Sequence, residues 1–267
     1  MNIDDFRYMW RGKRLKTLSP KDADLLKPIN IHGKGTKHAL LLLHGFSSSP
    51  AVYRQLIPAI TPAYDAIISP ALPGHGDSLA AFSRATAVDW ITAAEEACQQ
   101  LVEHYQKVDV LGFSLGGLLA CHLSQKMPLN HLYLLAPALA LQVNVPWALK
   151  LIHAFRRLGF RYLRNRAGNL YSELHSEIAY RQLPVTTLIE ILTLVNDFKF
   201  TPPKCPTDLF LGSFDQTVNS IKVEEHFASL PNITTHWLKN SAHVLPLDGD
   251  LDSIIQCIKN NLRAASK

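Results

Sequence analysis

The pentapeptide Gly112-Phe113-Ser114-Leu115-Gly116 is the most informative stretch of this sequence. An apolar run typical of a strand precedes it at 108–111, and a run typical of a helix follows it at 117–123. The five residues alone also occur by chance in loops of small residues, so the prediction depends on the strand and the helix that flank them. In that context Gly-x-Ser-x-Gly is typical of a tight turn that presents a nucleophilic serine, because side chains at the glycine positions would collide with both neighbours. The sequence therefore predicts that Ser114 lies at the end of a buried strand, open to an acyl group.

Composition and charge describe an ordinary globular chain with two basic segments. The 267 residues, of which 47% are hydrophobic and 18% charged, fit one large α/β domain with an insertion, or two small domains. Residues 1–16 contain five basic and two acidic side chains, a net charge of +3, and residues 138–203 contain eight and four, a net charge of +4. Because the whole chain carries +5, the remainder is slightly acidic, which argues against a general nucleic-acid surface.

Cysteine spacing and hydropathy indicate a cytoplasmic protein. The four cysteines have no short spacing, so neither a structural metal site nor a disulfide framework is expected, and scattered thiols suit a reducing compartment. Residues 1–16 lack the apolar core of a signal peptide. Prolines and polar residues interrupt the longest apolar stretch, at 132–149, so no membrane span is expected.

Short apolar runs without polar alternation predict strands that are buried on both faces, as in a parallel sheet. Such runs are found at 38–43, 64–69, 108–111, 131–136, 207–211 and 234–238, and an edge strand is expected within 25–32. Segments with helical spacing lie between them, at 50–60, 87–105, 117–127, 221–230 and 252–262. The alternation pauses over 138–203, where the whole segment has a helical pattern.

This order of segments predicts an α/β fold, namely a doubly wound, mostly parallel sheet with a helical cap inserted after the sixth strand. We expect a basic N-terminal leader at 1–24 and a core that comprises 25–137 and 204–267. The cap is expected to occupy 138–203, after the strand that ends at Ala136.

Three polar residues are expected just beyond strand ends, where ligands bind to a parallel sheet of this type. Ser114 follows its strand directly, Asp215 lies in the loop after 207–211, and His243 lies in the loop after 234–238. A serine hydroxyl needs a base to take its proton, imidazole can act as that base near neutral pH, and a carboxylate fixes the imidazole tautomer. The chain order Ser…Asp…His is typical of this triad on a hydrolase sheet, so we predict these three residues to be catalytic.

Two other aspartates compete for the role of the acid. We expect Asp208 inside or before its strand and Asp248 beyond the histidine, which favours Asp215. A carboxylate that only caps its own loop is the alternative role for Asp215.

The oxyanion that develops during attack needs two backbone N–H donors. We assign them to Leu115, directly after the serine, and to Phe46, in the loop after the strand 38–43. His75 lies in a Pro-Gly-His-Gly sequence, which is typical of a structural turn, and receives no catalytic role.

With these residues in place, the chain resembles the α/β-hydrolase superfamily, and within it the group of bacterial carboxylesterases and monoacylglycerol lipases. The resemblance is carried by Leu-Leu-Leu-His-Gly-Phe at 41–46, Leu-Pro-Gly-His-Gly at 72–76, Gly-Phe-Ser-Leu-Gly-Gly at 112–117, Gly-Ser-Phe-Asp-Gln-Thr-Val at 212–218 and Ser-Ala-His-Val at 241–244. It implies Ser114 as the nucleophile, Asp215 as the acid and His243 as the base, with Phe46 and Leu115 supplying the oxyanion hole.

The insertion is expected to cover the site with apolar side chains. Residues 147–164 can be drawn as one helix, which Gly159 could interrupt, with Leu151 and Phe155 on its apolar face and arginines on the opposite face. A second helical stretch at 185–198 offers Leu188, and we predict these three residues, with Phe46, as substrate contacts. We favour a solvated basic face, and the alternative is transient contact with anionic lipid headgroups or an acyl carrier protein.

These observations predict a serine hydrolase that cleaves esters of hydrophobic acyl groups through an acyl-enzyme, without metal or cofactor. Short or medium acyl esters and monoacylglycerols are the expected small-molecule substrates. One alternative is a thioesterase or an esterase for methyl esters linked to a carrier protein. Another is a catalytically silent binding protein with the same fold, against which the complete Ser/Asp/His set argues. The oligomeric state is left open by the sequence.

Overall fold

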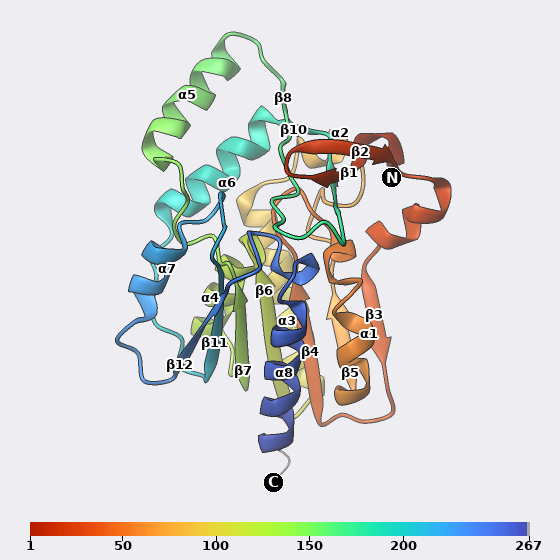
Figure 1. Cartoon of the computed structure of the whole chain (residues 1–267), viewed down its shortest axis with the longest axis vertical. Helices are drawn as coiled ribbons and strands as arrows, with labels where there is room; N and C mark the ends of the chain where they lie inside the picture. The colour runs from red at the N-terminus through yellow and green to blue at the C-terminus, as the bar shows by residue number, and fades with distance from the viewer. Residues whose placement is uncertain (266–267) are drawn as a thin grey trace.

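The computed structural model describes residues 1–265, and a seven-stranded sheet forms the centre of this part of the chain (Figure 1). The strand order is β12-β11-β7-β6-β4-β5-β3, and every neighbouring pair is parallel except β3 with β5. The strands are β3 (Ile29–His32), β4 (His38–Leu43), β5 (Ala66–Ser69), β6 (Lys107–Phe113), β7 (His131–Leu135), β11 (Thr207–Gly212) and β12 (Ile233–Leu238). The predicted α/β fold with a mostly parallel sheet is therefore confirmed.

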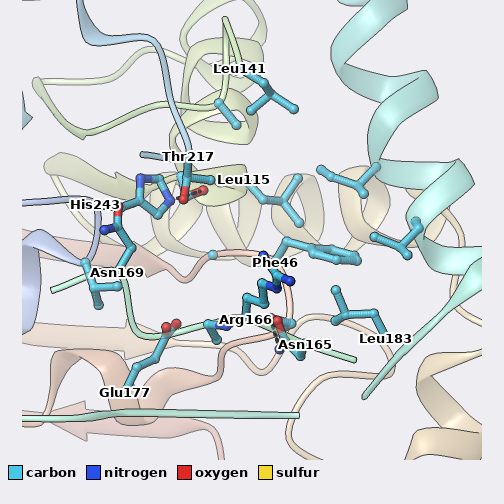
Figure 2. A pocket seen from close by; sticks show the side chains of 18 of the residues that line it. Phe46, Leu115, Leu141, Asn165, Arg166, Asn169, Glu177, Leu183, Thr217 and His243 are labelled. Atoms are coloured by element: carbon cyan, nitrogen blue, oxygen red, sulfur yellow. Dashed lines mark hydrogen bonds between the residues drawn. The ribbon is translucent and has the colours of Figure 1, made fainter. Parts of the chain in front are cut away.

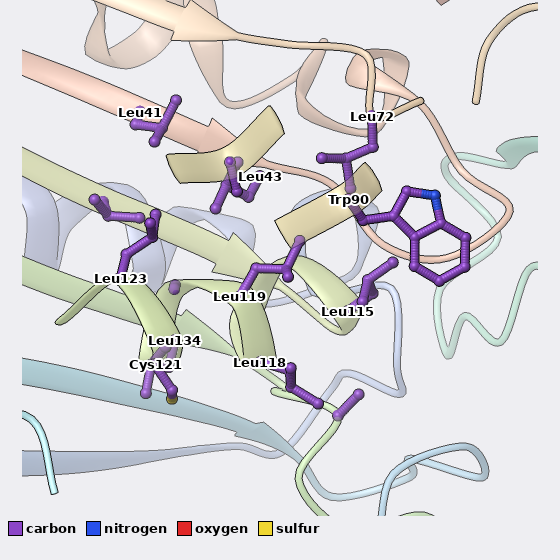
Figure 3. Packing of buried hydrophobic residues seen from close by; sticks show 14 of the residues in the cluster. Leu41, Leu43, Leu72, Trp90, Leu115, Leu118, Leu119, Cys121, Leu123 and Leu134 are labelled. Atoms are coloured by element: carbon purple, nitrogen blue, oxygen red, sulfur yellow. The ribbon is translucent and has the colours of Figure 1, made fainter. Parts of the chain in front are cut away.

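Helices cover both faces of this sheet because its strands are apolar on both sides. Alternate residues of β4 enter two separate cores, with Leu41 and Leu43 in one and Leu40 and Leu42 in the other. Figure 3 shows the first core, in which Leu41 and Leu43 pack near α4 and Trp90 of α3. The helices of the core are α1 (Ile57–Ile60), α2 (Leu79–Phe82), α3 (Ala87–His104), α4 (Leu115–Lys126), α7 (Ser220–Phe227) and α8 (Leu251–Ala265). Short 3₁₀ turns lie at η1 (Ile3–Asp5), η2 (Pro20–Leu26), η3 (Pro50–Tyr53), η4 (Thr61–Ala63) and η5 (Leu245–Leu247).

The insertion between β7 and β11 was expected to be wholly helical, and this prediction is wrong. It contains two helices and three short strands: α5 (Val145–Arg157), β8 (Tyr162–Arg164), β9 (Glu177–Tyr180), β10 (Gln182–Pro184) and α6 (Val185–Asp197). The predicted helix over 147–164 ends at Arg157 because Gly159, at φ +87°, turns the chain into β8, which pairs with β10. The insertion also follows the fifth strand of the central sheet along the chain, not the sixth.

The basic N-terminal segment is folded against the insertion. β1 (Phe6–Trp10) and β2 (Lys13–Thr17) form a hairpin, whose turn residues Arg11 and Gly12 both have positive φ angles, of 46° and 70°. β1 also pairs with β9, so hairpin and insertion share a three-stranded sheet in the order β2-β1-β9. None of the helices in the described part of the chain combines the length and the apolar character needed to cross a bilayer.

Candidate active site

Ser114 sits at the junction of β6 and α4 in a strained backbone conformation. Its φ and ψ angles are 54° and −113°, outside the regions that residues other than glycine usually adopt. The flanking glycines allow this turn, because a Cβ atom on Gly112 would overlap the carbonyl of Gly116, and one on Gly116 would overlap that of Leu43. The predicted elbow is therefore present, and it places the serine side chain at the carboxyl end of the sheet.

The three loops predicted to converge do so. The Ser114 hydroxyl lies 3.0 Å from His243 Nε2, and His243 Nδ1 lies 2.7 Å from Asp215 Oδ2. This geometry fits an imidazole that donates from Nδ1–H to the carboxylate and can accept the serine proton at Nε2. All three residues are at most 8% exposed, so little water competes for these hydrogen bonds.

The side chain of Asp215 is held in place by its own loop. Its Oδ1 accepts the backbone N–H groups of Thr217 and Val218 at 2.7 and 2.8 Å, which leaves Oδ2 for the imidazole. The carboxylate thus caps its loop and contacts His243 at the same time, and the two roles weighed for it are compatible.

The competing aspartates lie in other places. Burial alone would raise the pKa of Asp208, but hydrogen bonds from His131, His236 and Asn261 outweigh it and lower that pKa. These contacts are near the amino ends of the strands, away from Ser114. Asp248 is buried and accepts four backbone N–H groups, those of Tyr171, Ser172, Ala242 and Gly249. Its geometry is that of a carboxylate that fixes two loops.

Two backbone N–H groups are available near the serine. Leu115 is the first residue of α4, and the first N–H groups of a helix have no helical acceptor. The N–H of Phe46 donates to no acceptor within residues 1–265. Gly45 brings this loop against the serine, since a Cβ atom at that position would lie 3.2 Å from the Cβ of Ser114. The arrangement fits the donor pair predicted for the oxyanion.

Buried histidines support the loop that carries Phe46. His44 donates from Nδ1 to the carbonyl of Gly45 at 3.0 Å and accepts the N–H of Leu72 at Nε2, also at 3.0 Å. Burial lowers the pKa of His44 to about 4, so the ring is neutral near neutral pH. Burial also lowers the pKa of His75, whose ring packs edge-on against that of Phe46. Both histidines therefore act as structural groups.

A cavity of about 440 Å³ opens beside Ser114. One wall is apolar and comes mainly from α6, through Leu188, Ile191, Leu192 and Val195. The opposite part is polar and includes Arg164, Asn165, Arg166, Asn169 and Glu177. Figure 2 shows Glu177 and Asn165 toward one end of the cavity and Leu141 toward the other, with Phe46 and His243 between them.

The structure brings two of the four predicted substrate contacts to this cavity. Phe46 and Leu188 line it, whereas Leu151 and Phe155 do not. Leu151 is 38% exposed on α5, and Phe155 packs against α6 with Ile152. The apolar face of α5 is therefore used to hold α6, and α6 supplies the wall to which both helical segments were expected to contribute.

Asn169 is a residue of this site that sequence patterns did not indicate. Its carbonyl accepts the N–H groups of His243 and Val244 at 3.0 and 3.1 Å, and its side-chain oxygen accepts the N–H of Gln216 at 2.9 Å. One residue of the insertion thus connects the loop of the histidine to the loop of Asp215. Asparagine in an irregular segment carries no pattern that would single it out.

Comparison with known proteins identifies the family of this chain. A model of the alpha/beta hydrolase family matches residues 40–252, which include Ser114, Asp215 and His243. The chain belongs to the α/β hydrolase family. A thermostable monoacylglycerol lipase of Bacillus sp. strain H-257 is 28% identical over 221 residues, which cover 81% of this chain and 87% of that protein. A carboxylesterase of Bacillus subtilis strain 168 is 24% identical, with 84% and 91% covered.

One further relative is similar to part of the chain, and a solved structure is similar to most of it. A pimeloyl-[acyl-carrier protein] methyl ester esterase of Vibrio vulnificus is 37% identical over 86 residues, which cover 32% of this chain and 30% of that protein. A solved structure described as LipS and LipT, two metagenome-derived lipolytic enzymes, superposes with a TM-score of 0.80 at 25% identity. It covers 90% of this chain and 98% of that one. The chain is therefore a hydrolase of the esterase and lipase type.

Proposed function

We propose that this chain is a serine carboxylic-ester hydrolase that acts on esters of hydrophobic acyl groups through an acyl-enzyme. The observation that carries the proposal is the hydrogen-bonded series Ser114–His243–Asp215 at the edge of a largely apolar cavity. A silent binding protein has no need for a strained serine that is aligned with a base and an acid, because such strain costs about 1–3 kcal/mol.

The proposed reaction has two similar halves. Ser114 Oγ bonds to the ester carbonyl carbon while its proton passes to His243 Nε2, and the carbonyl electron pair moves onto oxygen beside the N–H groups of Phe46 and Leu115. As the tetrahedral intermediate collapses, the bond to the alcohol oxygen breaks and Nε2 returns the proton to that oxygen. Water then attacks the acyl-enzyme by the same route and releases the acid. Asp215 stabilises the imidazolium in both halves.

The cavity favours an ester with an apolar acyl part and a polar alcohol part. The α6 wall offers aliphatic side chains, and the cavity volume falls in the range of small-molecule sites. On the polar part, burial raises the pKa of Glu177, and a hydrogen bond from the Gly168 N–H at 2.7 Å offsets only part of that rise. A buried carboxyl group in the same cavity as the serine suits hydroxyl donors of an alcohol such as glycerol. Monoacylglycerols and short or medium acyl esters are therefore the proposed substrates.

A second candidate function is cleavage of a thioester or of a methyl ester on a carrier-linked acyl chain. The local similarity to a pimeloyl-[acyl-carrier protein] methyl ester esterase and the basic residues of the insertion favour it. Glycerol, methyl and thio esters of one chain length would separate the two candidates. Preference for the glycerol ester supports the first, and preference for the methyl or thio ester supports the second.

A series of p-nitrophenyl esters of increasing chain length tests the proposed function. We expect turnover by the natural chain and a loss of about a thousandfold or more in kcat for Ser114→Ala. Ser124→Ala is a matched control, because Ser124 lies on the same helix but donates only to the carbonyl of Cys121. Equal rates for Ser114→Ala and Ser124→Ala would remove Ser114 from the mechanism.

A further inference from the structure

Four arginines lie together where the N-terminal hairpin meets the insertion. Arg7 is in β1 and Arg14 in β2, while Arg164 ends β8 and Arg181 lies between β9 and β10. We call these four side chains the arginine cluster. The hairpin thus contributes half of a group that the insertion completes, which gives the basic N-terminal segment a specific place in the molecule.

Hydrogen bonds to backbone carbonyls hold three of the four members of the arginine cluster in position. Arg14 Nη2 donates to the carbonyl of Arg181 at 3.0 Å, and Arg164 Nη2 donates to that of Gly12 at 3.5 Å. Arg7 Nη1 donates to two nearby carbonyls at 2.7 and 2.6 Å. Each of these guanidinium groups uses only one nitrogen in this way, so other N–H donors remain free for a ligand.

The positive charge of the arginine cluster is not neutralised by the protein. Within the described residues 1–265, no carboxylate forms an ion pair with any of its members. Desolvation, followed by repulsion from Arg164, Arg7 and Arg181, lowers the pKa of Arg14. The Nε of Arg181 is also buried without a hydrogen-bond partner. Like charges held together in this way destabilise a fold unless an anion offsets them.

The arginine cluster reaches the cavity through Arg164, which lines it, and Arg166, outside the cluster, lines it as well. The apolar α6 wall lies across the same cavity and suits the acyl chain. We propose that the arginine cluster binds the phosphate group of a ligand at the mouth of the cavity. Guanidinium groups present parallel N–H donors that match phosphate oxygens and form strong charge-assisted hydrogen bonds.

The phosphate can belong to either of two sources with the same chemistry. It can be carried on the alcohol part of the ester itself, as in a monoacylglycerol phosphate, and this arm rests on the proposed function. It can also belong to the headgroups of an anionic bilayer in which a neutral ester is dissolved. Binding of the phosphate does not depend on ester cleavage.

Calorimetric titration of the Ser114→Ala protein tests the proposal without turnover. The probes are a soluble, short-chain monoacylglycerol phosphate and the matched monoacylglycerol, and the second arm uses phosphatidylcholine vesicles with and without phosphatidic acid. We expect the phosphate-bearing probe to bind about tenfold more tightly or better in at least one arm. The arm that shows the preference identifies the source of the phosphate.

Two double variants that lose the same charge at different places show whether the preference depends on the arginine cluster. Arg14→Gln with Arg164→Gln should abolish the preference, whereas Arg156→Gln with Arg157→Gln, which removes equal charge from the exposed last turn of α5, should keep it. Arg14→Lys with Arg164→Lys keeps the charge and should retain part of the preference. Thermal melting of each variant identifies any loss of folding, and Arg164→Gln alone disturbs the fold least because its hydrogen bond is long.

Equal binding of phosphate-bearing and neutral probes in both arms would overturn the proposal, as would an equal loss in the α5 control. Ester cleavage by the natural chain is measured separately. A phosphate preference without cleavage of any ester would support phosphate binding by the arginine cluster and contradict the proposed function. Ester cleavage without a phosphate preference would support the proposed function and contradict phosphate binding by the arginine cluster.

Discussion

The carbonyl oxygen of Asn169 accepts the backbone N–H of His243 at 3.0 Å, so the insertion directly holds the loop of the proposed base. The Asn169 side chain reaches the other side of the site, where it accepts the N–H of Gln216 next to Asp215. The insertion therefore does more than cover the cavity, because it fixes the distance between the base and the acid.

Replacing the Asn169 side chain should lower catalysis mainly because it frees the loop that carries Asp215. In Asn169→Ala the loop of Asp215 loses its acceptor, and we expect kcat to fall about tenfold with a smaller change in KM. Asn169→Asp keeps an oxygen at this place and should restore most of the rate. Steady-state kinetics that show no difference between the two variants would contradict this role.

Three aspartates that compete in the sequence should give three distinct phenotypes. Asp215→Asn should lower kcat by about ten-thousandfold, because an amide cannot hold the required imidazole tautomer. Asp248→Asn should mainly lower the melting temperature, since the carboxylate accepts four backbone N–H groups. Asp208→Asn is the matched control and should leave kcat within about twofold. A large loss of kcat in Asp208→Asn alone would contradict the assignment.

The apolar wall should determine the preferred acyl chain length. Leu188→Trp fills part of the cavity from α6 and should shift the preference toward shorter acyl chains. Leu151→Trp adds the same bulk on the exposed side of α5 and should leave the preference unchanged. The kcat/KM values for a series of chain lengths measure both. An equal shift in the two variants would show that α5 also contacts the acyl chain.

Burial of His44 should make the fold less stable in mild acid. Its pKa is lowered to about 4 by burial, so between about 6.5 and about 4 the unfolded chain binds a proton that the folded chain does not. The free energy of unfolding should therefore decrease as pH falls through this window, by about 3 kcal/mol in total from this group. Urea unfolding at several pH values checks this, and His44→Gln should flatten the dependence. An unchanged slope in that variant would contradict it.

Much of the central sheet and the convergence of the three loops could be predicted from the sequence. Runs such as 38–43 and 207–211 are apolar on both faces, and residues placed just after such strands meet at one edge of the sheet. The expectation that Ser114, Asp215 and His243 converge needed only this rule and the chain order.

The insertion was predicted less well, for physical reasons. Its short strands follow no period of their own, since β8 has three residues and β9 is buried at all four, and their pairing is decided by distant partners. The same holds for the N-terminal hairpin, whose second strand is exposed throughout and is positioned by its pairing with β1, which in turn pairs with β9. Contacts made through backbone carbonyls, such as that of Asn169, cannot be recognised from the sequence because any residue type can make them.

Covalent labelling with a fluorophosphonate, followed by mass spectrometry of the labelled peptide, is the decisive test of whether Ser114 is the nucleophile. We expect a single stable adduct on Ser114, with labelling slowed strongly in His243→Ala and absent in Ser114→Ala. An adduct on another residue, or labelling that is unchanged in both variants, would contradict it.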